Sequence, residues 1–197
     1  MRKAFPLLAA LAFCALACPD TLGQLCPAGT VSAGQFNVTL TLQAQSNSCV
    51  VTDDGDGGPA DGSLGSSTPQ MFAATLCSGL ADGGTHVLLA VAQHGVRDSV
   101  LGPDAGFVFS SLSTNVQGTV CRCPLDVQET ISGNLFGPPT GITPDSDGGL
   151  SNVVAIGGTV VDSVAASPPA GGADAGHCSC GLPCAVTYTL AGPKLQK

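Results

Sequence analysis

The hydrophobic pattern of this chain is a strict alternation over short stretches. Over residues 36–44 every second residue is apolar, and the residues between them are Asn, Thr or Gln. The segments 127–136 and 185–191 follow nearly the same alternation. A period of two is typical of a β-strand with one face buried and the other in solvent. The pattern therefore predicts a protein built from half-buried strands.

Five further segments have the composition of strands, which brings the predicted number to about eight. Val, Thr, Ser and Gly are abundant, Trp is absent, and Glu occurs once, so little favours helices. We expect a single all-β domain, either a sandwich or a small barrel. Stretches rich in Gly, Asp, Ser and Pro over 53–69, 137–149 and 167–176 predict long mobile loops. The five further strands are predicted over 70–77, 85–93, 106–110, 117–123 and 152–164.

The first eighteen residues have the layout of an export signal. Arg2 and Lys3 precede an apolar stretch that is too short to span a bilayer, which takes roughly 20 apolar residues. Small residues then lead to Cys18. This segment resembles the lipobox of bacterial lipoproteins, with Ala15 where leucine is usual. The resemblance implies a signal peptide over 1–17, a diacylglyceryl group on Cys18, and a protein anchored in the cell envelope, for which we expect the outer membrane.

A secreted protein is the alternative, because Ala15-Leu16-Ala17 also satisfies the Ala-x-Ala rule of ordinary signal peptidase. The ten cysteines help to choose between the two. Without Cys14 and a lipidated Cys18, eight cysteines remain and suit four disulfides, whereas an unmodified Cys18 leaves an odd thiol. Parity therefore favours the lipoprotein. Residues 18–33 would then be a tether and lead-in, and 34–197 the β-domain.

Two Cys-x-Cys segments suggest how the disulfides pair. Cysteines two apart on a strand point to the same face, so Cys121 and Cys123 can bond with Cys178 and Cys180 if their strands are neighbours. The other two bridges would then form among Cys26, Cys49, Cys77 and Cys184.

Charge excludes one class of partner. Loss of Arg2 and Lys3 with the signal takes the formal charge from −8 to −10, because all fourteen acidic residues lie beyond residue 17. The four remaining basic residues are scattered, so neither nucleic acid nor an anionic lipid surface is an expected partner. Half of the acids stand in Asp-Gly or Asp-Ala-Gly units, which predict turns. These are Asp54, Asp56, Asp61, Asp82, Asp104, Asp147 and Asp174.

Metal binding is a weak alternative for three parts of the chain. His177 with Cys178, Cys180 and Cys184 offers zinc ligands, but the spacing matches no common zinc module. The Asp-rich segments 54–58 and 145–149 place carboxylates as calcium loops do, yet neither has the closing Glu. We expect no cofactor.

No catalytic motif is present, and three residues remain as isolated candidates. His86 and His94 are too far apart along one predicted strand to share a ligand. Glu129, the only Glu, lies on the apolar parity of its strand, which suggests either a buried functional carboxylate or, as the preferred interpretation, an edge or bulge position. One carboxylate without a partner does not make an enzyme.

The sequence therefore predicts a lipoprotein that acts as a structural, accessory or binding module. Its anchor would be the lipid on Cys18, and its partner a protein or a glycan. The alternative is a secreted, disulfide-rich β-domain that binds or inhibits an extracellular partner.

Overall fold

The computed structural model describes residues 26–49, 65, 67–91, 95–117, 121, 123–168, 178 and 180–196. The predicted signal segment and Cys18 lie outside these residues. In the part that is described, no helix is long and apolar enough to cross a membrane.

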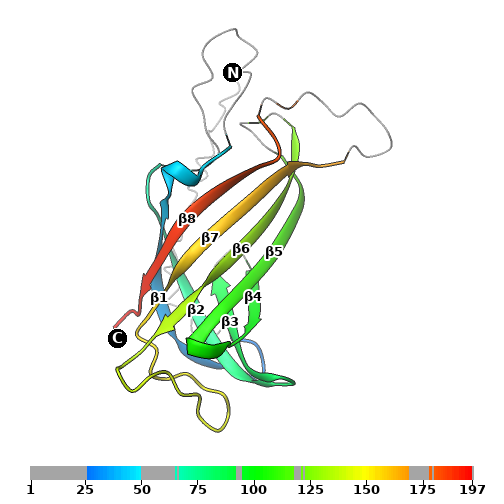
Figure 1. Cartoon of the computed structure of the whole chain (residues 1–197). Coiled ribbons are helices and arrows are strands. Elements are labelled where there is room, and N and C mark those ends of the chain that lie inside the picture. The colour runs from blue at the N-terminus through cyan, green and yellow to red at the C-terminus, as the bar shows by residue number, and fades with distance from the viewer. Residues whose placement is uncertain are drawn as a thin grey trace, which may run out of the picture.

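Eight antiparallel strands form one sheet in the order β4-β3-β2-β1-β8-β7-β6-β5. The sheet curls around a single interior, so that its two edge strands approach one another and the barrel is nearly closed (Figure 1). Two short 3-10 segments, η2 (Ala44–Ser46) and η3 (Pro103–Ala105), lie in the connections. The strands are β1 (Val31–Leu42), β2 (Gln70–Ala81), β3 (Gly84–Val91), β4 (Gly95–Val100), β5 (Gly106–Gln117), β6 (Pro124–Phe136), β7 (Ala155–Ala166) and β8 (Cys184–Pro193).

The all-β prediction is confirmed, with one strand misplaced. The segment predicted over 117–123 is wrong, because Gln117 ends β5 and Cys121 and Cys123 lie in the connection to β6. The sequence pattern missed β4, whose inward residues are Arg97 and Ser99 rather than apolar ones. Val96 and Val100 of the same strand are exposed on the outer face. A strand whose polar residues face the core does not show the inward-facing apolar residues by which a half-buried strand is recognised.

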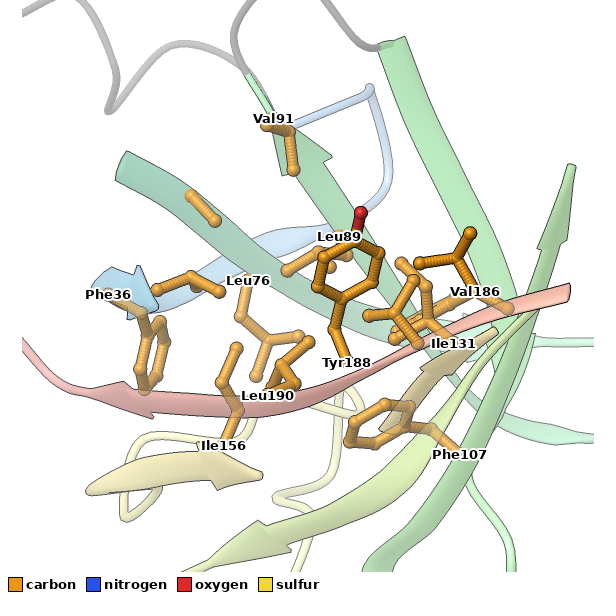
Figure 2. Packing of buried hydrophobic residues seen from close by; sticks show 14 of the residues in the cluster. Phe36, Leu76, Leu89, Val91, Phe107, Ile131, Ile156, Val186, Tyr188 and Leu190 are labelled. Carbon is orange, nitrogen blue, oxygen red and sulfur yellow. The ribbon is translucent and has the colours of Figure 1, made fainter. Parts of the chain in front are cut away.

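The hydrophobic core lies inside the barrel. Alternate residues of β1, β2, β3, β5, β6, β7 and β8 point inward and are buried, as the period of two requires. Figure 2 shows aliphatic and aromatic side chains from several strands meeting in this space. Among the buried core residues are Phe36, Leu76, Leu89, Phe109, Ile156 and Leu190.

The connection between β6 and β7 closes one end of the barrel. It is a loop as the sequence predicts, drawn below the strands in Figure 1, but its last residues are buried rather than exposed. Leu150 and Val153 belong to the core, and the Leu150 amide donates to Ser78 Oγ over 3.0 Å. Gly148 has no room for a side chain, because a Cβ there would lie 2.5 Å from the Gly79 carbonyl carbon.

Four disulfides brace the barrel, and their pairing agrees with the grouping predicted from the two Cys-x-Cys segments. Cys121 bonds with Cys180, and Cys123 with Cys178. The premise that all four lie on strands is wrong. These cysteines lie in the segments that precede β6 and β8, and Cys180 is an isolated bridge residue. The remaining pairs are Cys26–Cys77 and Cys49–Cys184.

Three of these bridges lie at the same end of the barrel. In an antiparallel sheet the end of β1 and the starts of β6 and β8 share one rim, and Cys49, Cys121, Cys123 and Cys184 lie at those points. The 137–154 loop closes the opposite end. The barrel therefore has three disulfides at one rim, while the opposite end has the Cys26–Cys77 disulfide and is covered by the packed loop.

Candidate ligand-binding cavity

A cavity of about 270 Å³ lies inside the barrel, in the half nearer the disulfide-braced rim. Seven strands contribute to its lining, and only β5 does not. Exposed Gln70 lies at its edge, so the cavity meets solvent there. Its apolar walls include Leu40, Phe72, Leu89, Ile131, Val160 and Leu190.

The sheet register explains how the lining residues come together. Glu129 and Ile131 are inward residues of β6 and stand opposite Asp162 and Val160 of β7. Val160 in turn stands opposite Tyr188 of β8. Figure 2 shows Tyr188 close to Leu89 and Ile131, which also line the cavity. Two neighbouring rows of side chains thus cross the interior. One is acidic, Glu129 and Asp162, and the other is mainly apolar, Ile131, Val160 and Tyr188.

An ion pair spans the seam between the two edges of the sheet. Arg97 of β4 approaches Glu129 of β6 with both Nε and Nη2 at 2.6 Å from Oε1. Ser111 Oγ donates to the same oxygen over 3.3 Å from the intervening strand β5. The pair is largely shielded, with 10% of the Arg97 side chain and 25% of the Glu129 side chain exposed. It is the charged boundary of the cavity.

The preferred expectation for Glu129, an edge or a bulge, is wrong. The strand β6 lies between β5 and β7, and its register with both is unbroken through Glu129. The register of β6 turns the carboxylate to the interior, where Arg97 of β4, a strand that the hydrophobic pattern did not show, compensates its charge. The alternative interpretation, a buried carboxylate, is the one that the geometry favours.

Asp162 is a second inward carboxylate, and it is only weakly compensated. It stands directly opposite Glu129 on one side and the apolar Val186 on the other. Within the described residues it forms no hydrogen bond and no salt bridge. Burial raises its pKa to about 6, the repulsion from Glu129 adds to the increase, and the more distant Arg97 offsets part of it. Above that pH the cavity lining carries two carboxylates and one guanidinium.

The histidine candidate that is described, His86, does not belong to this cavity. His86 is on the outer face of β3, where Nδ1 lies 3.0 Å from Asp98 Oδ1 of β4. Its Nε2 atom is buried and has no hydrogen-bond partner. His94 lies outside the described residues.

The described residues that were candidate metal ligands have other structural roles. Cys178, Cys180 and Cys184 are all bonded in disulfides, and His177 lies outside the described residues. Asp145 Oδ1 accepts the amides of Asp147 and Gly149, so this carboxylate stabilises a turn. The other Asp-rich segment, 54–58, is not described. Among the described residues, no group of three His, Cys, Asp or Glu side chains is placed to hold a metal ion.

Sequence reasoning identified Glu129 but missed Arg97, Asp162 and Tyr188. A usable signal existed for Asp162, since it shares its parity with Val160 and Val164 just as Glu129 shares its own with Val127 and Ile131. Two acidic residues, each on the apolar face of one of two successive strands, indicate a polar site in the interior. No comparable signal marks Arg97.

Comparisons with known proteins add no further constraint. No protein-family model matches the sequence, and neither a curated protein nor a solved structure is similar to it.

We predict that Asp162→Asn stabilises the protein at neutral pH. The folded-state pKa of Asp162 lies above the ordinary value of 3.8, so its ionisation favours unfolding. Its contribution to stability therefore falls as pH rises from about 4 to about 6, and the full cost remains above that range. We expect a gain of about 1–2 kcal/mol at pH 7.5, reduced for solvent screening of a partly exposed group.

Urea unfolding at pH 4, 5, 6 and 7.5 measures this effect. The variant should gain stability over the wild type progressively through the window. Asp82→Asn, a change at an exposed residue in the β2–β3 turn, is the matched control and should not show this profile. If the free energy of unfolding of Asp162→Asn changed with pH in parallel with that of the wild type, the placement of this carboxylate in the interior would be contradicted.

Proposed function

We propose that the chain is an exported lipoprotein, anchored through Cys18 to the cell envelope, whose barrel is a binding module for a small molecule. The cavity inside the barrel is the observation that carries the binding part of this proposal. The lipobox-like segment at residues 15–18 and the parity of the remaining cysteines support the anchor. Four disulfides are in keeping with an oxidising compartment outside the cytoplasm.

The architecture is suited to hold a ligand. An eight-stranded barrel is wide enough to be filled by side chains or to hold one small molecule. Here the side chains fill one half, while the half beside the braced rim leaves a cavity. The volume is just under the roughly 300–1,000 Å³ typical of pockets for drug-sized ligands, so the ligand should be smaller than these.

The covalent bracing supports binding because it reduces the cost of ordering the site. A rigid scaffold loses little conformational freedom when a ligand enters, and this raises affinity without further contacts. The bridge Cys49–Cys184 joins the segment that follows β1 to the start of β8, and both strands contribute lining residues. The cavity walls therefore do not depend on the ligand for their arrangement.

A lipid anchor on Cys18 predicts that the protein is found in the membrane fraction. The full chain, expressed in a bacterium, should fractionate with membranes, and Cys18→Ala should release it because the variant has no thiol to receive the lipid. Cys14→Ala, four residues earlier within the predicted signal, is the matched control and should leave the mature protein at the membrane. Immunoblots of the membrane, periplasmic and medium fractions measure the outcome. Wild-type protein in the medium would instead support the secreted alternative.

Binding makes a separate prediction for the barrel. In a panel of small aliphatic amines, alcohols and carboxylic acids, at least one compound should raise the melting temperature in a concentration-dependent way. Leu40→Phe, which adds volume to the cavity wall, should remove the effect. Leu112→Phe makes the same change at an exposed outer position of β5 and should retain it. If no compound stabilises the wild type, or if both variants respond equally, the cavity is not a binding site.

A further inference from the structure

The charges around the cavity do not balance. Among the described residues that line it, Arg97 is the only cationic group, and Glu129 and Asp162 are both acidic. Arg97 directs two nitrogens at one oxygen of Glu129. Among the described residues, Glu129 therefore has a close counter-ion and Asp162 has none. Like charges directly opposite one another on neighbouring strands are destabilising, so this arrangement has an energetic cost.

The surroundings of Asp162 define what could compensate it. Val186 stands opposite it on β8, and Val160 lies two residues before it on the same face of β7. The aromatic side chains of Phe72 and Tyr188 line the same cavity. Aromatic ring faces attract cations, and aliphatic walls favour an apolar chain. A ligand with one positive group and one short hydrocarbon part matches both properties.

We propose that the cavity binds a small organic cation, a primary alkylammonium with a short apolar chain, whose ammonium group pairs with Asp162. This proposal rests on the proposed function, because it requires that the cavity is a binding site. The chain would lie against Leu40, Leu89 and Leu190 in the apolar part.

Other ligand classes fit the same cavity less well. An anion would meet two carboxylates against one guanidinium. A neutral molecule would leave Asp162 ionised, largely desolvated and still without a close counter-ion. A hard metal ion needs several oxygen ligands and gains nothing from aliphatic walls, and the described residues hold no group of three suitable side chains. In an alkylammonium ion, the ammonium group pairs with the carboxylate and the hydrocarbon chain packs against the apolar part of the cavity.

Binding of such a cation should depend on pH in one direction. The charged or titratable groups facing Asp162 are Glu129 on β6, Arg97 on β4 and the Tyr188 phenol on β8. The cavity residues from β1, β2 and β3 carry none. The raised pKa of Asp162 means that protons compete with the ligand below about pH 6. Affinity should therefore be constant above pH 7 and fall by up to about tenfold per pH unit below 6.

The experiment compares three probes of equal chain length by isothermal titration calorimetry: n-pentylammonium, 1-pentanol and pentanoate. At pH 7.5 we expect n-pentylammonium to bind the wild type at least tenfold more tightly than either of the others. Asp162→Asn should weaken its binding at least tenfold and leave that of 1-pentanol unchanged. Asp98→Asn, at an exposed carboxylate on the outer face, is the matched control and should bind all three as the wild type does.

The possible outcomes separate this inference from the proposed function. Equal or tighter binding of 1-pentanol or pentanoate, lost in Leu40→Phe, would overturn the cation inference and support the binding module. Ammonium binding that survives in Asp162→Asn would likewise overturn it. If none of the three probes binds the wild type and the wider panel also fails, both proposals are wrong. Unfolding curves of each variant verify that it is folded.

Discussion

The ion pair between Arg97 and Glu129 is the interaction on which the remaining features of this barrel depend. The sheet has two edges, β4 and β5, and a curled sheet with unpaired edges is exposed to strand addition by other chains. Arg97 reaches past β5 to a carboxylate on β6, and Ser99 Oγ of the same strand accepts the Val108 amide of β5 over 3.1 Å. These side-chain contacts connect the edges where no ladder is formed between them.

This form of closure has a consequence for the interior. A shielded ion pair loses hydration, and its stabilising effect on the fold is small unless its hydrogen bonds are well satisfied. Glu129 has such partners in Arg97 and Ser111. The same arrangement places Asp162 beside an already paired carboxylate and leaves it with only the weaker, more distant attraction of Arg97. The contacts that close the seam thus also determine the net charge of the cavity.

The sequence pattern predicted the fold well where burial and alternation coincide. Val38, Ile131 and Leu190 lie on strands with a clear period of two, and the structure places all three in the core. The grouping of the cysteines was also predictable, because paired Cys-x-Cys segments restrict the geometry. The strand β4 was not predictable, since its inward residue is a charged Arg97. Its role depends on a partner 32 residues away in sequence.

The site could be predicted only in part for the same reason. Glu129 was recognisable as a carboxylate on an apolar parity, but its partner could not be identified without the strand order. Asp162 carries a similar signal on β7, yet only the register shows that it stands opposite Glu129. A single residue of slip would have turned it to the outer face. Register between strands is a property of the whole sheet rather than of either segment.

Asp162 is a carboxylate of the barrel interior that has no close counter-ion within the described part of the chain. The most direct test follows the side-chain carboxyl ¹³C resonance of Asp162 in the unliganded protein as the pH is changed. We expect a midpoint near pH 6. A midpoint at the ordinary value of an exposed aspartate, close to 3.8, would show instead that Asp162 is solvated or paired.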